Sequence, residues 1–148
     1  MKKTTCIYLE KDNKYLMLHR NKKEKDINKD KWIGVGGHVE ENETIDECVI
    51  REVKEETNLD LVNFKLCGEV LFILNNYAEQ MFVYTSKEFK GELKDCNEGT
   101  LEWIDKEKVL DLPIWEGDKL IFEEINKGNY FRLKLVYEND VLLISEHY

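Results

Sequence analysis

The segment GHVEENETIDECVIREVKEETNL, residues 37–59, decides how this chain folds around it. After Thr44, apolar residues recur with the spacing of one helix face; they are Ile45, Cys48, Val49 and Val53. Thr44 followed three positions later by Glu47 is a capping box, which fixes where a helix begins. Asn58 tolerates the left-handed conformation that ends a helix. The sequence therefore predicts a helix from Ile45 to Thr57.

Three glutamates of this helix stand out. At about 100° per residue, Glu52 and Glu56 fall in the middle of the apolar stripe, and Glu55 falls at its edge. A buried carboxylate is costly unless it is paired or coordinated, and two carboxylates one turn apart repel each other. Converging carboxylate oxygens suit a hard divalent cation, and Mg²⁺ is the usual ion beside phosphates. The alternative is a helix end where the glutamates reach water or are neutralised by Arg51.

A glycine pair, Gly36 and Gly37, precedes this helix by a short loop. Without side chains, the backbone here can approach a ligand or a metal closely. A Gly-Gly pair is also found in ordinary turns, so the pair gains meaning only from its spacing to the helix.

That spacing carries a resemblance to a known family. Gly37, five residues, Glu43, seven residues and then REVKEETNL at 51–59 resemble the Nudix box, G-x5-E-x7-R-E-U-x-E-E-x-G-U, where U is a bulky aliphatic residue. Asn58 stands where the pattern has glycine, and asparagine is the next best residue for a left-handed position. The order of elements in the rest of the chain also looks like a Nudix domain.

The resemblance implies an α/β/α sandwich with a mixed central sheet and flanking helices, formed by residues 1–148 as a single domain. It also implies hydrolysis of a nucleoside diphosphate linked to another group, with Mg²⁺ or Mn²⁺ as cofactor. The implied metal ligands are the Gly37 carbonyl, Glu52, Glu55 and Glu56, with Glu55 as a further ligand or the base. Arg51 and Glu43 would orient these glutamates.

Family members often add a glutamate from a later loop. Glu98 is the candidate here, as metal ligand or general base, and its alternative is a solvated loop acid. The acidic site repels phosphate only until metal is bound, which reconciles it with an anionic substrate.

The substrate signals are weaker. Residues 31–40, KWIGVGGHVE, resemble the start of the box in MutT-like oxidised-purine triphosphatases, with Ile33 in place of an asparagine that would contact the base. Trp32 in this stretch is a candidate for substrate contact, or else a core residue. His38, beside Gly37, would touch phosphate, or else is structural.

A second stretch, PIWEGD at 113–118, is similar to the W-P-D-D stretch of the mammalian-type oxidised-purine enzymes. On that mapping Trp115 stacks on the base and Asp118 hydrogen-bonds the purine. Gly117 replaces the first of the two acids, and the alternative for Trp115 is a core aromatic.

The leading interpretation is therefore Mg²⁺-dependent hydrolysis of a nucleoside triphosphate such as 8-oxo-dGTP to the monophosphate and pyrophosphate. One alternative is another Nudix substrate, namely ADP-ribose, a dinucleoside polyphosphate or a capped RNA end. The other is a non-catalytic domain that only binds a nucleotide, although such domains usually lack one of the glutamates.

The remaining elements follow from local pattern. We expect strands at 4–10, 15–20, 32–40, 61–74, 79–85 and 101–104, a helix at about 117–126 ended by Gly128, and a hairpin of 130–136 with 141–145. The first two strands should form a hairpin around the turn at 11–14.

Composition limits the partners. There are 31 acidic and 22 basic residues, giving a net charge of -9, which argues against binding to duplex nucleic acid. The acidic excess indicates either solubility or a carboxylate cluster. No apolar run reaches the length of a membrane span. The start lacks the apolar stretch of a signal peptide, and the four cysteines form no C-x-x-C pair. We therefore expect a cytoplasmic protein with buried thiols. We also expect a monomer or homodimer.

Overall fold

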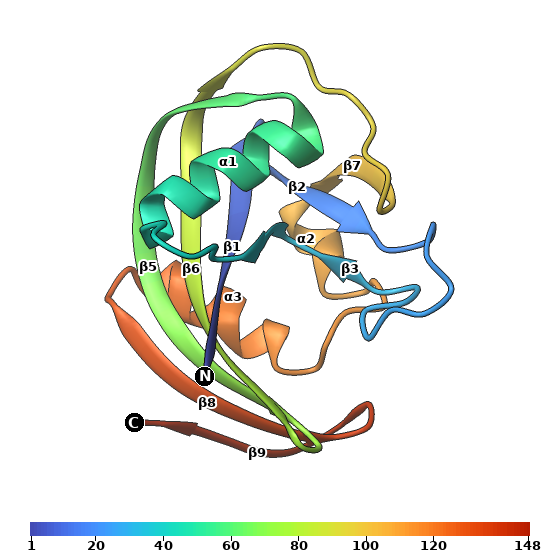
Figure 1. The fold of residues 1–148 in the computed structure, drawn as a ribbon, viewed down its shortest axis with the longest axis vertical. Helices are drawn as coiled ribbons and strands as arrows, with labels where there is room; N and C mark the ends of the chain where they lie inside the picture. Colours follow the sequence, from blue (N-terminus) through green and yellow to red (C-terminus); the bar gives the residue numbers. More distant parts are fainter.

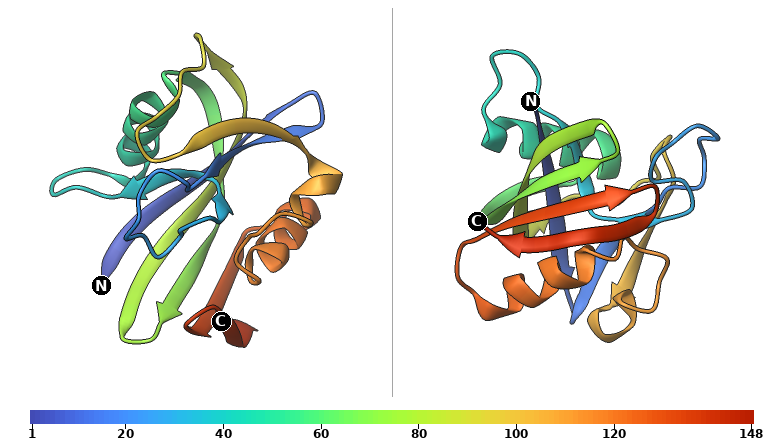
Figure 2. Two further views of the ribbon diagram at one scale, coloured as in Figure 1. Left: turned by 90° about the vertical axis from the view of Figure 1, so that its right-hand side faces the viewer. Right: turned by 90° about the horizontal axis from the view of Figure 1, so that it is seen from below.

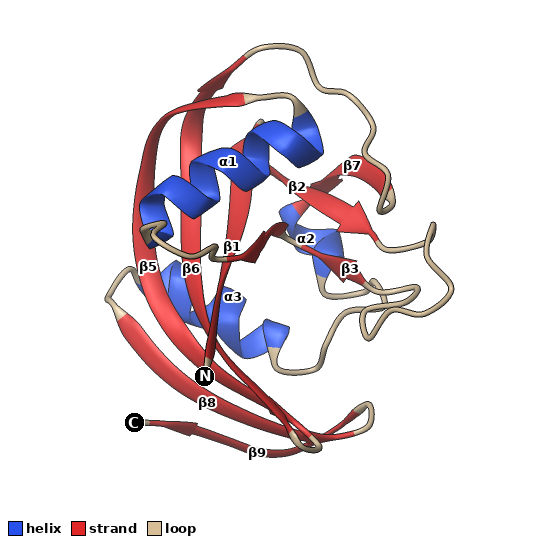
Figure 3. Cartoon of the chain, viewed as in Figure 1, coloured by secondary structure: helices blue, strands red, loops and turns tan.

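The computed structural model covers residues 1–148 and contains nine strands, connected as one mixed sheet, and three helices (Figures 1 and 3). The strands are β1 (Lys2–Lys11), β2 (Lys14–His19), β3 (Trp32–Ile33), β4 (Val35–His38), β5 (Asp60–Leu74), β6 (Tyr77–Lys90), β7 (Thr100–Asp105), β8 (Phe131–Glu138) and β9 (Val141–His147). The helices are α1 (Ile45–Thr57), α2 (Lys106–Val109) and α3 (Asp118–Lys127).

The helices lie on both faces of the sheet, which confirms the α/β/α sandwich. Figure 2 shows α1 on one side of the strands and α3 on the other. The main path of the sheet runs β3-β2-β1-β6-β5-β8-β9, with β4 beside β1 and β7 beside β2. Both parallel and antiparallel pairs occur, since β1 is parallel to β6 while β5 is antiparallel to β6.

Strand β1 shows why the sheet is covered on both faces. Its side chains alternate between faces, so Cys6 and Tyr8 join the core cluster under α3, whereas Ile7 and Leu9 join the cluster under α1. A strand buried on both faces belongs in the centre of a sheet. All four cysteines are free and buried, in agreement with the sequence prediction.

The expected hairpin of β1 and β2 is present, but it is short. Only the last residues of β1 pair with β2, at Glu10↔Tyr15 and Lys11↔Lys14. The preceding residues pair in parallel with β6 on one side and antiparallel with β4 on the other. The β4 pairing holds Gly36 and Gly37 against β1 and beneath α1, and this placement builds the site described below.

Several boundaries also differ from the prediction. Strand β6 begins at Tyr77, and its polar end continues to Lys90, where pairing with β5 satisfies the backbone before the following loop. The short helix α2 was not expected. Helix α3 agrees within about one residue, with Gly128 left-handed at φ 83° after its end. No helix of the structure is long and apolar enough to cross a membrane.

Candidate active site

Helix α1 is fixed at both ends as its sequence predicts. The Glu47 N–H donates to the Thr44 hydroxyl at 3.1 Å, and the Thr44 N–H donates to the Glu47 carboxylate at 2.9 Å. At the other end Asn58 is left-handed at φ 69°, and its N–H donates to the Lys54 carbonyl. With both ends fixed, the directions of the side chains along the helix are set.

The glycine pair meets two of the helix glutamates. The Gly36 N–H donates to Glu56 Oε2 at 3.0 Å. A Cβ atom at Gly37 would lie 2.6 Å from the Glu52 carboxyl carbon, so no other residue fits there without displacing that carboxylate. The two glutamates therefore face the glycine backbone rather than bulk water, and the alternative of a frayed helix end does not describe them.

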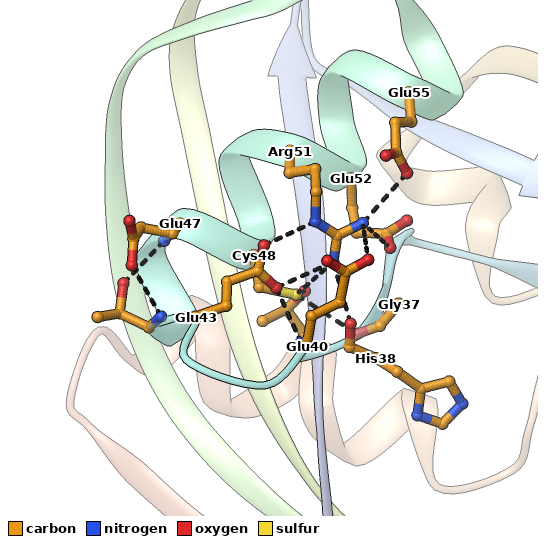
Figure 4. Close-up of polar contacts among 11 residues, drawn as sticks. Gly37, His38, Glu40, Glu43, Glu47, Cys48, Arg51, Glu52 and Glu55 are labelled. Atoms are coloured by element: carbon orange, nitrogen blue, oxygen red, sulfur yellow. Dashed lines mark hydrogen bonds and ion pairs between the residues drawn. The ribbon is translucent and has the colours of Figure 1, made fainter.

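Arg51 organises the carboxylates around this point (Figure 4). Its guanidinium binds Glu43 through two hydrogen bonds of 2.7 and 3.0 Å, Glu52 at 2.8 Å and Glu55 at 3.1 Å. It also donates to the His38 carbonyl at 3.1 Å. One arginine thus ties the loop before α1 to the middle of the helix.

The pKa values follow from these contacts. Hydrogen bonds from Arg51 lower the pKa of Glu43 to about 2. Burial raises the pKa of Glu52, against the lowering effect of Arg51. Burial raises the pKa of Glu56 further, and a hydrogen bond to Glu98 adds to the effect. Glu56 is 7% exposed and has no basic side chain in contact.

Glu98 comes from the loop between β6 and β7 and lies against Glu56. Although partial burial acts to raise its pKa, the hydrogen bond from Glu56 and the charges of Arg20 and Lys23 keep it below the ordinary value. Arg20 Nη1 lies 2.9 Å from one Glu98 oxygen, and Lys23 Nζ lies 3.5 Å from the other. The fold therefore brings the later-loop glutamate to the helix glutamates.

These groups line a cavity of about 540 Å³. One end holds the glycine pair with Glu52, Glu56 and Glu98, and its basic lining residues are Arg20, Lys23 and His38. The other end is aromatic and apolar, and its lining includes Tyr8, Phe72, Met81, Trp115 and Asp118. The cavity thus combines an acidic end that has a few cations with an end that is rich in aromatic and apolar side chains.

Not every residue singled out from the sequence lines this cavity. Trp32 is half-buried and stacks on His19, with ring centroids 4.4 Å apart, and it is not among the lining residues. Glu55 is on the outer side of α1 with 58% of its side chain exposed, held by Arg51. Glu43 does not line the cavity, but it binds Arg51 and accepts a hydrogen bond from the N–H of the lining residue Glu40 at 3.0 Å.

Trp115 and Asp118 do line the cavity, but Trp115 is only 6% exposed. Its ring meets Phe72 and Tyr137 edge-on, and the Lys31 ammonium lies 4.6 Å from its centroid. Burial raises the pKa of Asp118 to about 7, and the charge of Lys31 opposes that rise.

The donor set fits a hard divalent cation. No three acidic, histidine or cysteine side chains are close enough to form a ready ligand cluster, because Arg51 draws Glu52 and Glu55 while Arg20 draws Glu98. The donors are nevertheless carboxylate oxygens around the glycine backbone of β4, and oxygen ligands are the chemistry that Mg²⁺ prefers. A cation would also compensate the burial of Glu56.

The loop at 21–31 contributes residues that sequence reasoning missed. Asp26, Ile27 and Asn28 line the cavity, yet their stretch reads only as a polar loop. Arg20, just before this loop, contacts both Asp26 and Glu98. No local signal reveals such placement, since a loop's position depends on long-range contacts.

Comparison with known proteins gives consistent results. A family model described as "NUDIX domain" matches residues 2–125. An uncharacterised Nudix hydrolase of Bacillus subtilis (strain 168), YvcI, is 30% identical over 84% of this chain and 78% of its own length. The oxidised purine nucleoside triphosphate hydrolase of Danio rerio is 30% identical over 62% of this chain and 60% of that protein. The crystal structure of the mutator MutT protein from Bacillus halodurans superposes with a TM-score of 0.88 at 28% identity, covering 99% of this chain and 97% of that one.

Proposed function

Because the chain belongs to the NUDIX domain family and is a Nudix pyrophosphohydrolase of the MutT type, we propose that it uses Mg²⁺ to hydrolyse a nucleoside triphosphate to the monophosphate and pyrophosphate. The leading substrate is 8-oxo-dGTP. The observation that carries the proposal is Glu56, a buried carboxylate with no basic side chain in contact, at the glycine pair where Glu52 and Glu98 also point.

The metal-holding residues in this proposal are Glu52, Glu56 and the Gly37 carbonyl, with Glu98 and Glu55 as further ligands. Bound Mg²⁺ would neutralise phosphate charge, activate a water and stabilise the leaving oxygen. Arg51, held by two hydrogen bonds to Glu43, orients Glu52. Mn²⁺ offers similar coordination to oxygen ligands.

The chain's own residues supply the rest of the chemistry. Glu98 lines the cavity, and its lowered pKa keeps it a carboxylate at neutral pH, the form that a general base needs. Glu55 is the alternative base, but it does not line the cavity. Arg20, Lys23 and His38 line the acidic end and would face the phosphates.

The apolar end of the cavity would hold the base. Trp115 forms one wall, and a base stacked on the ring face now covered by Lys31 must displace that ammonium group. When its carboxyl group is deprotonated, Asp118 would accept hydrogen bonds from N–H groups of the base. The resemblance to the Danio rerio oxidised purine hydrolase supports this substrate class.

A substrate panel tests the proposal. Purified protein with Mg²⁺ would be offered 8-oxo-dGTP, the four dNTPs, ADP-ribose, a dinucleoside tetraphosphate and a capped RNA. The proposal expects the highest kcat/KM on 8-oxo-dGTP, with pyrophosphate as a product. A higher kcat/KM on ADP-ribose, the dinucleoside tetraphosphate or the capped RNA would replace the substrate assignment. Binding without any hydrolysis would replace the catalytic assignment.

We also propose that residues 1–148 act as one domain, in the cytoplasm, as a monomer or homodimer. The continuous sheet supports the first part. Light scattering of the purified protein measures the oligomeric state.

A further inference from the structure

Asn28 occupies a defined place at the apolar end of the cavity. It is half-buried and lines the cavity in the loop between β2 and β3. The indole Nε1–H of Trp115 donates to Asn28 Oδ1 at 2.7 Å. The backbone N–H of Asn28 donates to Asp26 Oδ1 at 3.0 Å, and its carbonyl accepts from the Lys31 N–H at 2.8 Å. The residue is therefore held on both its backbone and its side chain.

These contacts settle which way the amide faces. An indole N–H can only donate a hydrogen bond, so the atom that faces Trp115 must be the carbonyl oxygen of Asn28. The amide NH₂ then has no acceptor in the protein. Every fully buried side-chain N or O atom of the structure has a hydrogen-bond partner, so this NH₂ is not fully buried. The NH₂ is accordingly an accessible donor on a residue that lines the cavity.

The same arginine ties this loop to the acidic end. Arg20 Nε binds Asp26 at 2.7 Å while Arg20 Nη1 binds Glu98 at 2.9 Å. The Arg20 and Asp26 side chains are largely buried, with 14% and 7% exposed, and that of Glu98 is 32% exposed. A continuous chain of contacts therefore fixes Asn28 relative to Glu98, and so fixes the spacing between the two ends of the cavity.

We propose that Asn28 is a specificity-determining residue whose amide NH₂ donates a hydrogen bond to an oxo acceptor on the substrate base. Asp118, which lines the same cavity, supplies the matching acceptor for a base N–H. A donor next to an acceptor suits the edge of an oxopurine, where a carbonyl oxygen lies beside ring N–H and amino groups. This inference rests on the proposed nucleotide substrate and names the part of it that is recognised.

The test uses Asn28→Asp, which keeps an oxygen toward Trp115 and the side-chain size but replaces the NH₂ donor with an acceptor. Asn126→Asp, an exposed position on α3, is the matched control for the added charge. The substrates are 8-oxo-dGTP and 2-deoxyribose 5-triphosphate, which has no base. Loss of one good base contact should lower kcat/KM on 8-oxo-dGTP about tenfold to a hundredfold, mainly through KM. On the base-free substrate, both variants should match the wild type.

A purely structural role for Asn28 gives a different result. An equal loss on both substrates, or no loss on 8-oxo-dGTP, would overturn the inference. Binding of 8-oxo-dGMP and 2-deoxyribose 5-phosphate by calorimetry separates it from the proposed function, because binding needs no hydrolysis. The inference holds, even where 8-oxo-dGTP is not hydrolysed, if the wild type binds 8-oxo-dGMP and Asn28→Asp weakens this binding without weakening the binding of 2-deoxyribose 5-phosphate. If the wild type does not prefer the base-bearing monophosphate, the inference fails.

Discussion

Helices α1 and α3 pack on opposite faces of one sheet, and each buries a glutamate. Glu56 on α1 is 7% exposed and Glu124 on α3 is 8% exposed. Glu124 is bound by His147 and lies 3.7 Å from Lys127. Glu56 instead contacts a backbone N–H and a second carboxyl group, that of Glu98.

The difference separates a structural charge from a functional one. Burial penalises a carboxylate unless a partner compensates it. Glu124 contacts two basic side chains of the protein itself, His147 and Lys127. Glu56 has only partial compensation, which leaves α1 poised for a cation from outside. On our proposal, Glu56 of α1 serves the metal chemistry, whereas Glu124 of α3 is a structural charge.

The largest expected effect separates the two glutamates directly. Mutation of a residue that only orients a metal ligand typically lowers metal affinity or activity about 10- to 100-fold. Glu56→Gln removes a proposed ligand itself, so it should lower kcat/KM by about a hundredfold or more. Without metal, the variant should be about as stable as the wild type, because the raised pKa of Glu56 leaves little charge on this side chain to remove at neutral pH. Steady-state kinetics and urea unfolding measure both.

Glu124→Gln is the matched control for that change. It removes an ion pair with largely exposed partners, so the free energy of unfolding should fall by only about 0–1 kcal/mol, and kcat should stay the same. Similar kinetic losses in the two variants would erase the distinction between the helices.

A second substitution tests how α1 is organised. Arg51→Ala frees Glu43, Glu52 and Glu55 from their shared partner, and activity should fall about 10- to 100-fold, as for other groups that orient metal ligands. Arg51→Lys should keep more activity than Arg51→Ala but less than the wild type, because one ammonium group cannot replace the paired guanidinium contacts. Full activity in Arg51→Ala would show that these contacts do not position the site.

A third substitution tests the supporting role of α3. Ile121 is a fully buried residue of this helix, so Ile121→Ala should lower the free energy of unfolding by about 2–5 kcal/mol. The kcat of the remaining folded protein should not change. Chemical denaturation with parallel activity assays measures both, and a kcat loss at constant stability would contradict the assignment.

The smallest effect concerns acid stability. Arg51 lowers the pKa of Glu43 to about 2 from 4.5. A lowered native pKa contributes stability that is present above the unfolded pKa and is lost as pH falls toward the native value. Glu43→Gln should therefore lose less stability than the wild type between about pH 5 and about pH 3. Identical acid profiles in urea unfolding would argue against the Glu43–Arg51 coupling.

Most features of α1 can be predicted from the sequence, but few features of the cavity around it can. The capping box at Thr44, the left-handed Asn58 and the glutamates within the apolar stripe are local patterns, and each was confirmed as geometry. Local rules work here because a helix is stabilised by residues three and four positions apart.

The opposite end of the cavity depends on long-range contacts. Asn28 and Asp26 reach it through Arg20 and Trp115, which are separated from each other by most of the chain. The parallel pairing of β1 with β6 likewise comes in addition to the short hairpin that its turn predicts. Neither the loop position nor the strand register has a periodic signal in the sequence.

One measurement tests the central claim most directly. Thermal unfolding of wild type, Glu56→Gln and Glu124→Gln would be followed during Mg²⁺ titration at neutral pH. An ion that binds only the native state raises Tm with its concentration. The account predicts that Mg²⁺ raises the Tm of the wild type and of Glu124→Gln but leaves that of Glu56→Gln nearly unchanged. An equal rise in all three proteins would contradict it, because the buried Glu56 carboxylate would then have no part in holding the cation.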